Sequence, residues 1–161
     1  MFEFISRYFW LIAIVFTVVQ HLPLIRSNEG ELASDPIKAR EERTLKRLYA
    51  LGTVLPWMIL GAGMLTGSAP TVWYIFRPQD GNPFVVAFFG VTFGMSLVMA
   101  YWILFADGAK KVVEYRLMSL NISGTTKQLS PLILKLVAGI GPFFILFWIY
   151  MAMQMNIPIQ K

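Results

Sequence analysis

Four long apolar runs are the feature of this sequence that most restricts its fold. They cover about residues 8–25, 48–65, 83–106 and 136–155, and each approaches the roughly 20 residues that a helix needs to cross a hydrocarbon core. At that depth the backbone must satisfy its own hydrogen bonds, so each run is predicted to be an α-helix. The composition agrees, because only 14% of the residues are charged, against about 25% in a typical soluble domain.

Three dipeptides mark where helices should begin. Asp35-Pro36, Asn82-Pro83 and Ser130-Pro131 each pair an N-cap residue with a proline at the first helical position, where the missing N–H of proline costs nothing. With these starts, helices are predicted over about residues 4–25, 36–66, 83–106 and 131–155. The chain, residues 1–161, is therefore expected to be one all-α integral membrane domain, a bundle of four transmembrane helices.

The distribution of lysine and arginine predicts the orientation of this bundle. Basic residues concentrate in the connections between the first and second and between the third and fourth apolar runs, while the other face has only Arg7, Arg77 and Lys161. This bias places both charged connections in the cytoplasm and both termini on the non-cytoplasmic side. We expect a protein of a bacterial inner membrane or an organellar membrane. Since the basic residues lie beside apolar runs, their partner is expected to be the bilayer rather than nucleic acid.

A basic collar precedes the second apolar run and is the first candidate site. It consists of Lys38, Arg40, Arg43, Lys46 and Arg47. Anionic lipid headgroups attract such residues by about 1 kcal/mol each near the membrane surface, and docking of an acidic partner is the alternative. Glu42 and Lys46 have the i,i+4 spacing of a helix-stabilising ion pair, so part of the collar is expected to support the helix.

Small residues in the third apolar run form a second candidate site. Gly90 and Gly94 make a GxxxG motif, and Ala87 lies on the same side of the helix. Small residues allow two helix backbones to approach closely in a membrane. We favour packing against the chain's own helices, with an oligomer or partner interface as the alternative. Gly63 and Gly67 form a second such pair in the preceding helix.

His21 is the single histidine, near the end of the first apolar run. One interpretation makes it a ligand for haem, a chlorin or a quinone, and the interpretation that we favour is a histidine hydrogen-bonded near the membrane interface. The absence of cysteine excludes thiolate metal sites, and no metal site is predicted. No cofactor is required by the sequence. Charged residues after the third run, together with Lys135, are expected to form a solvated surface: Asp107, Lys110, Lys111, Glu114 and Arg116.

The sequence contains no phosphate-binding glycine loop, HExxH or GxSxG motif. Glu42-Arg43, followed by Pro56, resembles the start of the second helix in the MAPEG family of small four-helix membrane enzymes, which includes the microsomal glutathione transferases. That resemblance implies a glutathione-dependent enzyme acting on lipophilic substrates. The polar Asn and Glu positions expected after the motif are occupied here by Ala50, Leu51 and Thr53.

Three functions therefore remain open, with the first preferred. The chain is expected to be a non-catalytic accessory or assembly subunit of a larger membrane complex, in contact with the bilayer and with other membrane subunits or further copies of itself. The alternatives are an electron-transfer subunit that binds its cofactor through His21, and a MAPEG-like enzyme.

Overall fold

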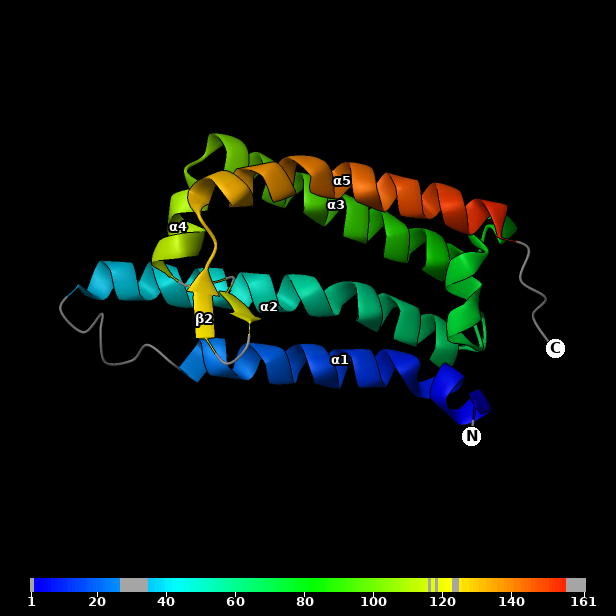
Figure 1. The fold of residues 1–161 in the computed structure, drawn as a ribbon. Helices are drawn as coiled ribbons and strands as arrows, with labels where there is room; N and C mark the ends of the chain where they lie inside the picture. Colours follow the sequence, from blue (N-terminus) through cyan, green and yellow to red (C-terminus); the bar gives the residue numbers. More distant parts are fainter. Residues whose placement is uncertain (1, 27–34, 116, 118, 123–124, 156–161) are drawn as a thin grey trace.

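Four long helices dominate the structure, a computed structural model that describes residues 2–26, 35–115, 117, 119–122 and 125–155 (Figure 1). The long helices are α1 (Phe2–Arg26), α2 (Pro36–Leu65), α3 (Pro83–Phe105) and α5 (Pro131–Gln154). The shorter elements are the 3₁₀ helices η1 (Val72–Phe76) and η2 (Pro78–Asp80), helix α4 (Gly108–Glu114), and strands β1 (Ser119–Ile122) and β2 (Thr125–Gln128).

All four long helices are long and apolar enough to cross a membrane. This confirms the predicted set of candidate spans, with bounds close to the expected ones. Side-chain N-caps stabilise the starts of α2 and α3 at the predicted residues. The Asp35 carboxylate accepts hydrogen bonds from the backbone N–H groups of Ile37 and Lys38, and the Asn82 side chain accepts from those of Phe84 and Val85. These contacts satisfy donors that a helix start otherwise leaves unpaired.

The long helices pack in sequence order, α1 on α2, α2 on α3 and α3 on α5. Figure 1 shows α1 and α2 side by side in one layer and α3 and α5 in the other, with α1 beginning and α5 ending at the same end of the molecule. We call this end, which also holds η1 and η2, the η end. The opposite end, with α4 and the two strands, is the α4 end.

Each end has its own buried cluster. At the η end, Leu60 and Met64 of α2 pack with Ile75 of η1. The same cluster includes three residues of α3: Val85, Phe88 and Phe89. Aromatic rings extend this cluster across three helices, since the Phe88 ring lies 5.5 Å from Trp57 and the Phe89 ring 5.6 Å from Trp148, centroid to centroid. At the α4 end the buried residues are Ile103, Ala109, Val112, Tyr115, Leu117 and Leu134.

The segment between α3 and α5 adds a small strand pair to a chain that is otherwise helical, as predicted. It contains α4 and an antiparallel pair of short strands, in which Ser119 pairs with Gln128 and Ile122 with Thr125. Ser123-Gly124 separates the strands in the sequence, a dipeptide typical of turns, and threonine and isoleucine favour extended backbone. Strands of four residues contain too few positions for an alternating apolar and polar pattern to be recognised in the sequence, so this pair was not predicted.

Candidate functional site

The basic collar lies at the α4 end, where one of its residues, Lys38, forms an exposed ion pair with α4. The Lys38 ammonium pairs with the Glu114 carboxylate at 3.4 Å. Glu41, which precedes the predicted Glu42-Lys46 pair, pairs with Lys111 of α4 and accepts a hydrogen bond from the Tyr115 hydroxyl at 3.2 Å. Part of the charged surface predicted to be solvated therefore ties two elements together, while Arg116 lies outside the described residues.

Lys46 is the collar residue whose surroundings differ most from the prediction. Its ammonium pairs with the Glu42 carboxylate at 2.5 Å, so the predicted i,i+4 pair forms, but both side chains are more than nine-tenths buried. Lys46 is thus turned away from any lipid headgroup. The remaining collar side chains are exposed: Lys38, Arg40, Arg43 and Arg47.

Two ionisable groups beside α4 have displaced pKa values. Burial raises the pKa of Tyr115 to about 12, and its hydrogen bond to the Glu41 carboxylate adds to the shift. The Lys110 ammonium, 3.0 Å from the Asp107 carboxylate, lowers the pKa of Asp107, and the charges of Lys135 and Lys111 lower it further. Asp107 and Lys110 are both exposed, so their pair contributes little to stability.

His21 lies between α1 and α2 with its ring edge-on to Tyr49. Its Nε2 atom lies 3.0 Å from the Thr53 hydroxyl oxygen, and that hydroxyl donates its own proton to a backbone carbonyl of α2, 2.9 Å away at Ala50. A ring proton on Nε2 satisfies both contacts, because the hydroxyl then accepts from His21 while it donates to the carbonyl. Nδ1 is buried and has no hydrogen-bond partner among the residues that the structure describes.

This arrangement presents neither ring nitrogen to a ligand. Nε2 is engaged by Thr53, and Nδ1 is enclosed between the helices. An iron or magnesium ion could reach His21 only if the Thr53 contact broke or the two helices separated. Among the residues described, no group of three histidine or carboxylate side chains is placed to hold a metal ion.

The glycines of α2 allow close contacts, though not in the predicted pairing. A side chain at Gly63 would meet Phe84 of α3 at 2.7 Å, and one at Gly61 would meet the Trp10 ring of α1 at 2.5 Å. Gly52 likewise faces Met95. A side chain at Gly67 would meet no described atom within 4 Å, and the φ of Gly67 is +75°, so it follows the end of α2 as a turn residue instead of packing. The sequence analysis did not identify Gly52 and Gly61. The one indication in the sequence is that each is a glycine within a run of large apolar residues.

The GxxxG face of α3 differs from our preferred prediction. A side chain at Gly90 or Gly94 would meet no atom of the described residues within 4 Å, and Ala87 on the same side is exposed. The chain's own helices therefore leave this face uncovered. Large exposed side chains continue the surface toward the α4 end, with Val98 69% and Tyr101 66% accessible.

Comparison of the chain with models of protein families, with curated proteins and with solved structures returned no match. The resemblance to the MAPEG family thus stays limited to Glu42-Arg43 and Pro56. In the structure these two charged residues lie on different sides of α2, because Glu42 is buried against Lys46 while Arg43 is exposed and donates from Nε to the backbone oxygen of Ala39.

Proposed function

We propose that this chain is a non-catalytic integral-membrane subunit that assembles with other membrane chains through α3. The observation that carries this proposal is the uncovered face of Ala87, Gly90 and Gly94. We infer further that the α4 end lies in the cytoplasm and both termini outside, in a bacterial inner membrane or an organellar membrane, because the collar and α4 hold seven of the fourteen lysine and arginine residues, whereas the segment that connects α2 to α3 holds only Arg77.

The physical argument concerns the cost and use of glycine in a transmembrane helix. Glycine weakens a helix interior by roughly 1 kcal/mol relative to alanine. In a membrane this cost is offset where a second helix packs closely against the glycine, because helix association there is driven by packing and not by exclusion of water. Gly52, Gly61 and Gly63 have such a neighbour within this chain. Gly90 and Gly94 have none, so a helix from another chain would supply it.

The two alternatives draw less support from the same residues. A cofactor bound through His21 would have to displace Thr53 or part α1 from α2. A glutathione site of the MAPEG kind would need Glu42 and Arg43 to act together, whereas Lys46 engages the buried Glu42 and Arg43 lies at the surface.

The test is extraction of the tagged full chain from its native membrane in a mild detergent, followed by sizing and mass spectrometry of what migrates with it. We expect a particle larger than the monomer that contains a second membrane chain or further copies. Gly90→Leu, which places a bulky side chain on the uncovered face, is expected to release the monomer.

Gly139→Leu is the matched control. Gly139 on α5 also has open space around it, but Gly141, two residues further along, lies on a different side of that helix, so the two form no shared face of small residues such as Ala87, Gly90 and Gly94 form. Gly139→Leu should leave the particle intact. A wild-type protein that runs as a lone monomer would refute assembly itself. Equal loss of the particle in both variants would instead refute the assignment of the contact to α3.

A further inference from the structure

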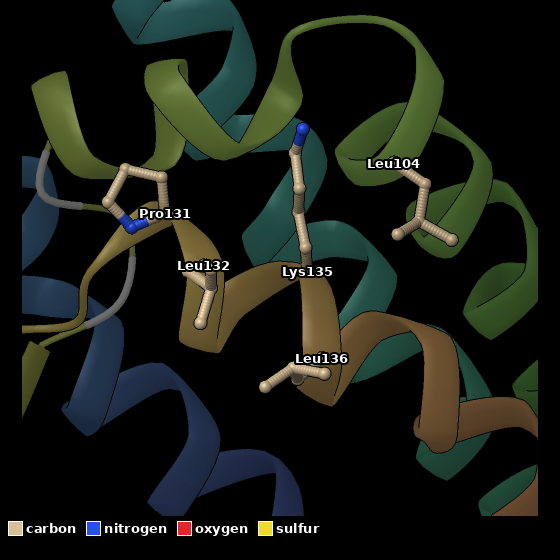
Figure 2. Close-up of a pocket in the computed structure, with 5 residues that line it drawn as sticks. All are labelled: Leu104, Pro131, Leu132, Lys135 and Leu136. Carbon is tan, nitrogen blue, oxygen red and sulfur yellow. The ribbon is translucent and has the colours of Figure 1, made fainter.

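A notch in the outer surface lies where α3 ends and α5 begins, at the α4 end of the molecule. Leu104 of α3 and the first two turns of α5 line it, the latter with Pro131, Leu132, Lys135 and Leu136. Its volume is about 450 Å³, within the roughly 300–1,000 Å³ of small-molecule sites. Figure 2 shows the Lys135 side chain extended from α5 between Pro131 and Leu104, with the Leu136 side chain lower in the view beside the ribbon of α5.

Lys135 differs from the other lysines whose side chains the structure describes. Each of the others has a carboxylate within ion-pair distance: Lys38 with Glu114, Lys46 with Glu42, Lys110 with Asp107, and Lys111 with Glu41. No carboxylate of the described residues pairs with Lys135, which is exposed and lies about one turn inside a helix able to span a membrane. An ammonium so near hydrocarbon is costly unless it reaches water or an anion.

The surroundings of Lys135 combine one positive charge with apolar walls. Leu132 and Leu136 expose 69% and 58% of their surface, which leaves an apolar strip along the first turns of α5. The charge of Lys135 helps to lower the pKa of Asp107, but the Asp107 carboxylate is already paired with Lys110 at 3.0 Å. A ligand that fits this notch therefore carries an anionic group joined to a long apolar chain.

We propose that the notch binds one anionic phospholipid, with its phosphate on the Lys135 ammonium and an acyl chain along Leu104, Leu132 and Leu136. Charge complementarity selects the headgroup, because a basic side chain near the surface attracts an anionic lipid by about 1 kcal/mol. A zwitterionic lipid would bring its own cation beside Lys135 and gain less. None of these residues belongs to the face of Ala87, Gly90 and Gly94 on α3, so this proposal can be tested independently of the proposed assembly.

The experiment is native mass spectrometry of the full chain incubated with equal amounts of phosphatidylglycerol and phosphatidylcholine. We expect the wild-type protein to retain one phosphatidylglycerol molecule in preference. Lys135→Gln should lower that preference roughly fivefold, the factor that corresponds to about 1 kcal/mol. Lys38→Gln, which removes the same charge from a lysine at the same end that is paired with Glu114, should keep it.

Absence of a wild-type preference would overturn the proposal, and so would an equal loss in both lysine variants, which would indicate attraction by net charge alone. Should Lys135→Gln fail to fold, Leu136→Trp serves instead, because it fills the notch and keeps the charge. Retention of the bound lipid by a folded Leu136→Trp protein would also contradict the site.

Discussion

Single residues decide how closely the long helices approach one another. Gly61 allows the Trp10 ring of α1 to lie against the backbone of α2, and Gly63 does the same for Phe84 of α3. At these two positions even one added methyl group would overlap an aromatic ring of the neighbouring helix. The same residue type on the outer side of α3 meets open space, so its role depends on what lies outside the chain.

Gly61→Ala is expected to destabilise the protein by about 1–3 kcal/mol, the usual cost of inserting a methyl group into a well-packed core. The added carbon would lie 2.5 Å from a Trp10 ring atom, which forces α1 and α2 apart. Unfolding of the detergent-solubilised protein, followed by circular dichroism, measures the change. Gly139→Ala, at a position with nothing within 4 Å, is the control and should be neutral or slightly stabilising. Equal costs in the two variants would show that Gly61 does not set the α1–α2 contact.

At the scale of elements, the long helices were predictable and their facing sides were not. Proline and N-cap pairs locate the starts of α2, α3 and α5, and apolar length predicts that all four helices can span a bilayer. But a helix that is apolar all round, such as α3, carries no stripe that distinguishes core from lipid. For this reason the sequence predicted GxxxG packing inside the chain, whereas Gly90 and Gly94 face outward.

Helix α4 and the strands were missed for a different reason. Their segments are short and polar, and their positions depend on contacts with residues distant in the sequence, such as Glu41 with Lys111 and Tyr115. Sequence spacing predicted the Glu42–Lys46 pair because both residues belong to one helix. Its burial, in contrast, follows from how the elements around it pack.

The attachment of α4 to α2 should depend on pH through Tyr115. The pKa of this residue is raised to about 12, above the value near 10 expected in an unfolded chain. A raised pKa means that the folded state holds the proton more tightly, so the stabilisation is complete below about pH 10 and is lost as the pH rises toward 12. Titration of the phenolate ultraviolet signal, wild type minus Tyr115→Phe, measures this directly. A difference signal that titrates near pH 10 would contradict the buried hydroxyl bonded to Glu41.

Over the whole molecule, the chain forms two layers with different chemistry at their two ends. The η end combines the start of α1, the end of α5 and a bridge of aromatic rings, whereas the α4 end gathers the collar, α4 and the ion pairs (Figure 1). Apolar surface covers the long helices between these ends. Such a distribution suits a bilayer, with each end in a different aqueous compartment.

Cysteine labelling in intact cells tests this central claim most directly, because the chain has no cysteine of its own. Gln79→Cys marks the η end and Lys110→Cys marks the α4 end, both at exposed positions. With a membrane-impermeant maleimide, we predict that Gln79→Cys is labelled from outside and that Lys110→Cys reacts only after the membrane is permeabilised. Labelling of both positions from the same side would contradict an arrangement in which the four helices cross the membrane between these two ends.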